Sequence, residues 1–460
     1  DELLGSDGIC SDTEGREIVE MLAELPDYWD VNVSSWANDS ATSRFTDEGY
    51  QEPYVSFVKQ LTTKPVVGVG RFTSPDTMVS QIRRGILDLI GAARPSIADP
   101  FLPRKINEGE TDDIRECIGC NICTTNNYLM APIRCTQNPT MGEEWRRGWH
   151  PERIAKKSTD DQVLIVGAGP AGLEAARALG HRGYPVMLAE AQTTPGGRVT
   201  RESALPGLSA WARVRDYRLT QIDKMANVEM YLNSELSAQD VLDTGATLVG
   251  LATGSVWRDD GVGRHSSVPI KGATHSHVLT PDHIMGGTQI QGSVVVYEDD
   301  HFYMASVVAE KLALAGCEVT MVTPSFTVAR FTEFTLEIVP IHKRLAQLGV
   351  RIISNHELSI IEEDCVQVSD IYSGLQTTVM CKHVVMVAGR TPNCALFDAL
   401  CQQCNTHLPK VYALGDARAP GTIAAAVYSG HTFARHLRLE TTDRAPFLRE
   451  DVTPELGKEQ

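Results

Sequence analysis

Four cysteines gather in one short stretch of the 460-residue chain. Cys117, Cys120, Cys123 and Cys135 follow the spacing C-x2-C-x2-C-x11-C. Three thiolates at steps of three residues can converge on one small cluster, and a fourth can complete the set of sulfur ligands. Zinc also binds four thiolates, but more often as two separated C-x2-C pairs. The spacing therefore favours an iron–sulfur cluster over zinc or over four unconnected thiols.

The remaining cysteines indicate the redox state of the protein's compartment and do not predict a second functional site. Cys401 and Cys404 form another C-x2-C, but it has no partner pair and no evident helix start to lower a thiol pKa, so we interpret both as incidental. The total of eleven cysteines is odd, which argues against a disulfide framework. A reducing compartment such as the cytoplasm is expected.

A glycine motif, G-A-G-P-A-G at residues 167–172, follows an apolar segment at 163–166 and precedes an alanine-rich segment. In a strand–turn–helix of this kind, Gly167 permits the tight turn, Gly169 lets the backbone approach a pyrophosphate, and Gly172 lets helix and strand pack closely. The helix N-terminus adds unpaired N–H groups and a positive dipole end. The motif predicts a site for ADP or for a dinucleotide.

Further residues fit the same site. Glu190 ends the next expected strand, where an acid accepts from ribose hydroxyls and disfavours a 2′-phosphate. Gly197 and Arg198 belong to a second glycine turn with a cation beside it. Asp416 follows another apolar segment and can accept from ribose or ribityl hydroxyls, although a Gly-Asp pair alone is a weak signal.

A second strand–helix–strand pattern begins near residue 293. Where glycines would follow its first strand, residues 297–304 read Y-E-D-D-H-F-Y-M. Large and acidic side chains fill the place that a pyrophosphate would occupy. We therefore predict that this module does not bind NAD(P)H.

The first 110 residues predict βα repeats with parallel strands at 28–33, 65–69 and 87–92. Two of these strands lead into Gly70-Arg71 and Ala93-Arg94. In a βα barrel, loops at this end of the last strands bind phosphate, and an arginine can hold it with two hydrogen bonds. The alternative is that these arginines form surface salt bridges.

Trp36 and Asp39 lie just beyond the first of these strands. A tryptophan can bind a cationic ammonium over its ring, and an acid there can orient a base or hold a cation. On position alone, a packing role for Trp36 and a loop-capping role for Asp39 are equally ordinary.

Composition narrows the classes of function. The chain has 42 Lys and Arg against 59 Asp and Glu, a net charge of −17, so binding of nucleic acid by bulk charge is not expected. Hydrophobic residues make up 42% and charged residues 22%, which is ordinary for a globular protein. No apolar run is long enough for a membrane span, and no signal peptide opens the sequence.

Together these segments resemble one family, the iron–sulfur flavoproteins typified by trimethylamine dehydrogenase, which are relatives of the 2,4-dienoyl-CoA reductases in the old yellow enzyme superfamily. The similarity covers essentially the whole chain. It is carried by G-V-G-R (68–71), A-R-P-S-I-A-D-P-F-L-P (93–103), D-D-I-R (112–115), C-I-G-C-N-I-C (117–123), G-E-E-W-R-R-G-W-H-P (142–151) and the glycine motif. F-Y-M-A at 302–305 is similar to the amine dehydrogenase branch in particular.

The resemblance implies an α/β fold in three parts. Residues 1–155 would form the C-terminal part of an FMN-binding (β/α)8 TIM barrel with the 4Fe-4S loop. Residues 161–285, completed by 405–440, would form a Rossmann-like module for ADP or FAD. Residues 290–400 would form an NAD(P)H-domain-like module with a degenerate glycine motif.

The resemblance also implies a reaction, the oxidative N-demethylation of a methylated amine to formaldehyde and the demethylated amine. Electrons would pass from FMN through the 4Fe-4S cluster to an electron-transferring flavoprotein, and the enzyme would be a homodimer. Residue by residue, Asp39 matches the active-site acid and Trp36 a wall of the substrate site. The other matches are Gly70, Arg71, Ala93 and Arg94 at the FMN phosphate, Glu190 at the ADP ribose, and the four cysteines at the cluster.

Two departures from the family pattern bear on function. Residues 124–128 read T-T-N-N-Y where trimethylamine dehydrogenase has a second tryptophan of the substrate site, which favours another amine, such as dimethylamine, a dimethylglycine-like compound or histamine. Arg213 stands where the family has a docking tyrosine for its flavoprotein partner. An NAD(P)H-dependent enoyl reductase and an electron-transfer fragment without substrate chemistry are the alternatives.

The start of the chain at Asp1 fits this reading. Only three barrel strands are predicted, whereas a closed barrel needs eight. The resemblance places the other five upstream, with the cysteine that attaches FMN and the catalytic tyrosine and histidine. We therefore expect this chain to keep the cluster and ADP sites but not to turn over an amine.

Overall fold

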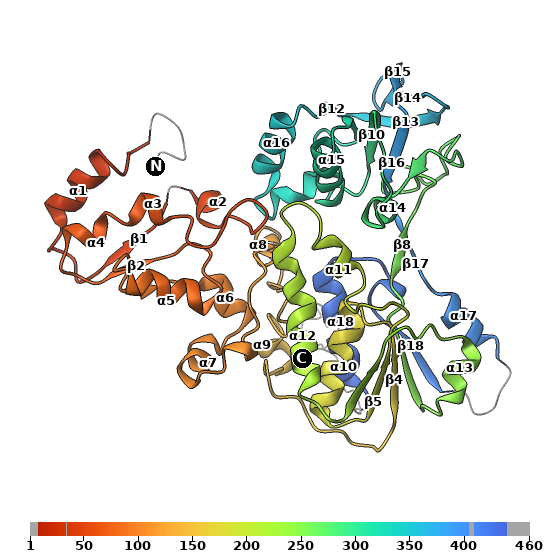
Figure 1. The fold of residues 1–460 in the computed structure, drawn as a ribbon, viewed down its shortest axis with the longest axis horizontal. Helices are drawn as coiled ribbons and strands as arrows, with labels where there is room; N and C mark the ends of the chain where they lie inside the picture. Colours follow the sequence, from red (N-terminus) through yellow and green to blue (C-terminus); the bar gives the residue numbers. More distant parts are fainter. Residues whose placement is uncertain (1–7, 34, 404–408, 439–460) are drawn as a thin grey trace, which may run out of the picture.

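The computed structural model describes residues 8–33, 35–403 and 409–438. Figure 1 shows three parts: an N-terminal part at one side, drawn in red and orange, and two α/β modules beside each other. Cys404, which the sequence pattern indicated to be incidental, lies outside the described residues.

The N-terminal part contains the three predicted strands. They are parallel and lie in the order β1 (Trp29–Val31), β2 (Val66–Gly68), β3 (Leu89–Ile90). The helices around them are α1 (Glu14–Leu22), α2 (Trp36–Asp39), α3 (Glu52–Val55), α4 (Val58–Leu61) and α5 (Pro75–Arg83). Because neighbouring strands run parallel with helices between them, all three strand ends face the same way, toward the cysteine segment.

The cysteine segment follows as short helices and loops. Its helices are α6 (Ala93–Ala98), α7 (Leu102–Glu108), α8 (Ile122–Tyr128) and α9 (Glu144–Arg147). It joins the N-terminal part to the first module (Figure 1).

The first module is a five-stranded parallel sheet in the order β18-β7-β4-β5-β6. Its strands are β4 (Val163–Val166), β5 (Val186–Ala189), β6 (Val228–Tyr231), β7 (Leu248–Leu251) and β18 (Lys410–Ala413). One face packs against α10 (Pro170–Arg182), α12 (Arg213–Asp223) and α18 (Ile423–His436), and the other against α13 (Ala238–Asp243) and α17 (Ala395–Cys401). Cover on both faces explains why the central strand β4 is apolar throughout.

The second module has the sheet order β12-β11-β10-β16-β9. Its strands are β9 (Val278–Leu279), β10 (Ser293–Glu298), β11 (Glu318–Val322), β12 (Arg351–Ile353) and β16 (His383–Val387). Helices α15 (Met304–Leu314) and α16 (Ile338–Gln347) cover one face. An antiparallel sheet of β13 (His356–Ile361), β14 (Cys365–Asp370) and β15 (Gln376–Met380) covers the other.

One boundary differs from the sequence expectation. Residues 278–285 had been placed with the first module, but β9 pairs with β16 of the second, and α14 (Pro281–Met285) follows β9 directly. Partner choice in a sheet depends on distant strands, which a local pattern does not reveal.

Two crossing segments join the modules. β8 (Ser255–Trp257) and β17 (Arg390–Pro392) pair as an antiparallel ribbon, so the chain leaves the first module and returns to it side by side. After the return, β18 pairs with β7 and α18 packs on α10. No helix in the described part of the chain is both long and apolar enough to cross a membrane.

Candidate functional site

The four cysteines line one small cavity between the N-terminal part and the first module. The turn that brings them together uses left-handed backbone at Gly119 (φ 62°) and Asn121 (φ 54°). A Cβ on Gly119 would lie 2.9 Å from the backbone nitrogen of Ser43, so a larger residue does not fit. The remaining wall of this cavity comes from Arg94, Ile97, Ile118, Asn121, Ile122, Thr136 and Gln137.

The chemistry of these sulfurs suits a cluster. Burial raises the pKa of Cys120, Cys123 and Cys135 to about 12, so without a metal the thiols stay protonated. Hydrogen-bonding groups already face two of the sulfurs: the Gly119 N–H donates to Cys117 Sγ at 3.3 Å, and Thr136 Oγ1 lies at hydrogen-bond distance, 3.2 Å, from Cys120 Sγ. Four soft donors with N–H support are the usual ligands of an iron–sulfur cluster.

A single metal ion fits less well. In the part of the chain that the structure describes, no group of three or more His, Cys, Asp or Glu side chains is arranged to hold one ion. The four cysteines instead share the wall of one cavity, as the ligands of a cluster do.

The two strand-end arginines lie beside the cysteine segment. Arg71 has left-handed backbone (φ 59°). Its buried Nε and Nη1 atoms form no hydrogen bond with any of the described residues. Burial lowers the pKa of this guanidinium. Arg94 directs Nη1 to the Ala41 carbonyl (2.9 Å) and to Asn121 Oδ1 (2.5 Å), and it lines the cysteine cavity. The unpartnered Arg71 atoms fit an anion such as the FMN phosphate.

Trp36 and Asp39 both lie on α2. Asp39 Oδ1 accepts a hydrogen bond from Gln51 Nε2 at 3.0 Å, and the Asp39 carbonyl accepts one from the Tyr50 hydroxyl at 2.6 Å. Gln51 is fully buried, so its amide fixes the carboxylate. Trp36 is 46% exposed in this chain. The structure thus holds Asp39 in place and leaves the Trp36 ring at the surface.

The glycine motif lies at the rim of a cavity of about 1100 Å³. A Cβ on Gly172 would overlap the carbonyl oxygen of Gly167, whereas a Cβ on Gly169 would meet nothing within 4 Å. Gly167 itself is left-handed (φ 99°). Gly172 therefore serves packing, and Gly169 leaves space at the start of α10, as the phosphates of ADP require.

The predicted polar residues of this cavity are partly engaged already. Glu190 accepts from the backbone N–H groups of Ala168 (2.7 Å) and Gln192 (2.9 Å), so it also holds the glycine turn. Arg198 donates to the Ser255 carbonyl at 2.8 Å. Gly197, at φ 53°, lies against Gly169.

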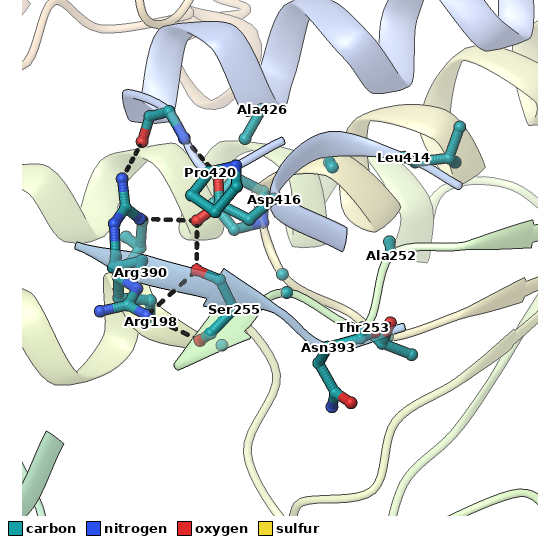
Figure 2. Close-up of a pocket in the computed structure, with 18 of the residues that line it drawn as sticks. Arg198, Ala252, Thr253, Ser255, Arg390, Asn393, Leu414, Asp416, Pro420 and Ala426 are labelled. Carbon is teal, nitrogen blue, oxygen red and sulfur yellow. Dashed lines mark hydrogen bonds and ion pairs between the residues drawn. The ribbon is translucent and has the colours of Figure 1, made fainter. Parts of the chain in front are cut away.

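Arg390 is a cavity residue that the sequence patterns did not reveal. Its Nη1 lies 2.6 Å from Asp416 Oδ2, and its Nη2 donates to the Gly421 carbonyl at 2.7 Å (Figure 2). Ser255 Oγ donates to the same Asp416 oxygen at 2.8 Å. Arg390 and Ser255 belong to the β17–β8 ribbon, so no motif near Asp416 could have indicated either residue.

The acidic turn of the second module is internally satisfied. Glu298 accepts from the Ala329 N–H (2.9 Å), and Asp299 accepts from the His265 N–H (2.9 Å). His301 has left-handed backbone (φ 63°) and lies 3.4 Å from both carboxylates. Burial alone would lower the pKa of His301, but these two acids raise it to about 9. Side chains thus fill the turn that a glycine cradle would leave open.

Three family models match separate parts of the chain. Residues 1–113 match the NADH:flavin oxidoreductase / NADH oxidase family, residues 165–233 an NAD(P)-binding Rossmann-like domain, and residues 279–393 the OYE-like second alpha/beta domain. Each of the three parts of the chain therefore matches a unit known from flavin- or NAD(P)-dependent oxidoreductases.

Three of the known proteins that this chain resembles over most of its length act on amines. Dimethylamine dehydrogenase from Hyphomicrobium sp. (strain x) is 38% identical over 98% of this chain and 66% of its own length. Histamine dehydrogenase from Rhizobium sp. 4-9 superposes with a TM-score of 0.90 at 50% identity, over 98% of this chain and 64% of that one. The 6-hydroxypseudooxynicotine amine oxidase from Pseudomonas geniculata N1 gives 0.91 at 49% identity, over 94% and 65%.

The chain is similar over nearly its whole length to amine dehydrogenases, and two of its parts match models of old yellow enzyme-like flavin oxidoreductases, in agreement with the sequence motifs. It spans about two thirds of the length of the relatives named above.

Proposed function

We propose that this chain supplies the iron–sulfur and ADP-binding parts of an FMN-dependent amine dehydrogenase. The single observation that carries the proposal is the extended similarity to dimethylamine dehydrogenase, 38% identity over 98% of the chain. The four cysteines around one cavity, next to Arg71 and Arg94, support it independently. The barrel, the homodimer, the cytoplasmic location and an electron-transferring flavoprotein as acceptor are parts of the same proposal.

The proposed reaction oxidises a carbon next to the amine nitrogen. A bound FMN would supply the hydride acceptor for that carbon, and hydrolysis of the iminium would give an aldehyde and the shortened amine. Asp39, held by Gln51, would orient the substrate or a neighbouring base. Trp36 would place its ring face against the ammonium. Arg71 would hold the phosphate, with Arg94 beside it and with the backbone of Gly70 and Ala93.

In the first module, the N-terminus of α10 and Gly169 would receive the diphosphate of ADP or FAD. Gly197, Arg198 and Asp416 line the same cavity. Arg390 belongs to this proposed site as well, because it fixes the Asp416 carboxylate.

The acidic turn of the second module disfavours the alternative of an NAD(P)H-dependent enoyl reductase. Glu298 and Asp299 are fully buried where the diphosphate of a nicotinamide cofactor would approach the start of a helix. Two carboxylates at that place repel phosphate.

The substrate has two candidates. A methylated amine such as dimethylamine would give formaldehyde and the demethylated amine. An arylalkyl amine such as histamine is favoured by a separate observation, because histamine dehydrogenase is 50% identical over 98% of this chain and 64% of its own length. The Asn126-Asn127 pair after the third cysteine offers amide groups in place of an aromatic wall.

The test is anaerobic titration of the natural protein with dimethylamine, trimethylamine, dimethylglycine and histamine, with the flavin spectrum as readout. We expect one amine to bleach the flavin and NADPH to leave it oxidised. If NADPH reduces the flavin rapidly and no amine does, the proposal is wrong and the reductase alternative holds.

A further inference from the structure

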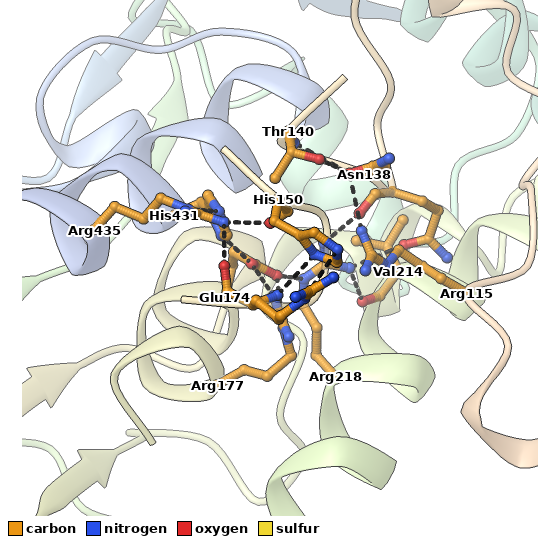
Figure 3. Close-up of polar contacts among 12 residues, drawn as sticks. Arg115, Asn138, Thr140, His150, Glu174, Arg177, Val214, Arg218, His431 and Arg435 are labelled. Atoms are coloured by element: carbon orange, nitrogen blue, oxygen red, sulfur yellow. Dashed lines mark hydrogen bonds and ion pairs between the residues drawn. The ribbon is translucent and has the colours of Figure 1, made fainter. Parts of the chain in front are cut away.

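A group of buried charges lies between the cysteine segment and the first module (Figure 3). Its centre is Glu174 on α10, which is fully buried. One carboxylate oxygen of Glu174 lies 2.6 Å from Arg177 Nη2 and 2.8 Å from His431 Nδ1, and the other accepts from Arg218 Nε at 2.8 Å. We call Glu174, Arg177, Arg218 and His431 the Glu174 network.

Arg218 connects this network to the cysteine segment. Its Nη1 donates to Gln137 Oε1 at 2.9 Å, and its Nη2 donates to the Gln137 carbonyl at 3.1 Å. The Gln137 amide in turn donates to the Glu116 carbonyl at 3.0 Å. Glu116 precedes the first cysteine and Gln137 follows the last one by two residues, so one guanidinium and one amide hold the two ends of the segment together.

The same contacts reach a sulfur. The backbone N–H groups of Asn138 and Gln137 face Cys135 and lower the pKa of its thiol against the effect of burial, and Gln137 lines the cysteine cavity beside Cys135. Arg218 fixes the Gln137 peptide through its carbonyl, and Arg115 fixes Asn138 through a 3.0 Å hydrogen bond to Oδ1. Arg218 binds both the side chain and the carbonyl of Gln137, and this carbonyl shares a peptide group with the Asn138 N–H, so the two buried arginines hold this stretch of backbone beside the sulfur.

Within the Glu174 network, two buried arginines, Arg177 and Arg218, contact one carboxylate. Arg115, Arg177 and Arg218 are 1%, 3% and 0% exposed, and Glu174 is the buried carboxylate that contacts this group. The other buried acid nearby, Asp99, is paired with Lys105 at 2.8 Å. Buried cations are costly without a counter-charge. An iron–sulfur cluster with four thiolate ligands is an anion, and its place beside Gln137 would provide that counter-charge.

We infer that Arg218 and Gln137 are positioning residues of the iron–sulfur site, which orient the N–H groups on Cys135 and supply buried positive charge that raises the reduction potential of the cluster. The inference rests on the proposed function for the cluster itself. Cluster potentials depend on net charge, on hydrogen bonds to the sulfurs and on solvent exposure, and the Glu174 network acts on the first two.

Two substitutions with opposite effects test this. Arg218→Gln removes the cation and Glu174→Gln removes the anion that offsets it. In the natural protein with its cluster, we measure iron and sulfide content and the midpoint potential by an EPR-monitored redox titration. We expect the ratio of reduced to oxidised cluster at the wild-type midpoint to fall about tenfold in Arg218→Gln, a shift of about 59 mV, and to rise in Glu174→Gln. Arg215→Gln on the same helix is the matched control and leaves the potential unchanged.

A purely structural role predicts another result. If both network variants keep the wild-type potential, shift it in the same direction, or differ from wild type only in iron content, the inference is wrong. Should Arg218→Gln fail to retain its cluster, Gln137→Glu is the second variant. It places a negative charge beside the Arg218 guanidinium and must lower the midpoint potential of the cluster. Wild-type protein with no iron or sulfide would overturn the proposed function, and this inference with it.

Discussion

Two of the three glycines in the 167–172 turn, Gly169 and Gly172, are expected to have opposite effects when each is replaced by alanine. In Gly172→Ala the new Cβ overlaps the Gly167 carbonyl oxygen and lies 3.0 Å from its carbon and 3.3 Å from Ala252 Cβ. The backbone of the turn must move, because no flexible side chain is there to yield. Overpacking of this kind costs about 3 kcal/mol, which lowers the melting temperature of the module by roughly 6 to 12 °C.

Gly169→Ala is the matched variant. Its Cβ has no neighbour within 4 Å, and the backbone at φ −74° suits any residue, so stability without ligand stays within about 0.5 kcal/mol of wild type. The methyl group instead enters the space proposed for the ADP diphosphate. We expect at least a tenfold loss of ADP affinity, about 1.4 kcal/mol, measured by calorimetry.

Thermal unfolding with and without ADP separates the two effects. Wild type should gain about 2.7 kcal/mol at an ADP concentration one hundred times the dissociation constant, and Gly169→Ala should gain less. If Gly172→Ala melts with wild type, or if Gly169→Ala binds ADP as tightly as wild type, the assignment of packing to one glycine and ligand contact to the other is refuted.

Three further predictions concern other parts of the molecule. Cys120→Ser should lose most of the bound iron and the visible cluster spectrum, whereas Cys401→Ser, at an exposed position, should keep both. His301→Asn tolerates the left-handed backbone but loses the cation. The pKa of His301 is raised to about 9, so its protonated ring stabilises the folded protein by about 1 to 2 kcal/mol. This stabilisation is complete below pH 6.5 and disappears as the pH rises through 9. Urea unfolding of wild type and His301→Asn, below pH 6.5 and above pH 9, measures it. Burial raises the pKa of Asp300 to about 6, so Asp300→Asn should stabilise the protein by about 1 to 2 kcal/mol at pH 7.5, and this gain should vanish toward pH 4; an equal gain at both pH values would contradict the assignment.

Local patterns predicted the elements and the turns well. The cysteine motif and the 167–172 turn are each encoded in one short stretch of sequence. The three N-terminal strands were evident from alternating helical and apolar segments. What was missed depends on contacts between distant segments. Arg390 reaches Asp416 only because the two crossing strands pair, and nothing around either residue indicates that pairing.

The same limit applies to the roles of individual side chains. Glu190 was predicted as a ribose partner from its place at a strand end, but both of its oxygens also accept backbone N–H groups of the neighbouring turns. Arg94 was predicted beside a phosphate, and the structure places one of its nitrogens on a carbonyl and on Asn121. The position of a residue in the sequence predicts which site its side chain lies near. Its hydrogen-bond partners depend on loops from distant parts of the chain.

The return of the chain through the β8–β17 ribbon has a consequence for synthesis. β18 and α18 complete the first module, but they leave the ribosome only after the whole second module. Until then, the exposed edge of β7 and the apolar side of α10 have no cover and offer a template for intermolecular pairing. A ribosome stalled before residue 410 would therefore hold a folded second module on an unfinished first one, and chaperone binding to nascent chains should peak in that interval.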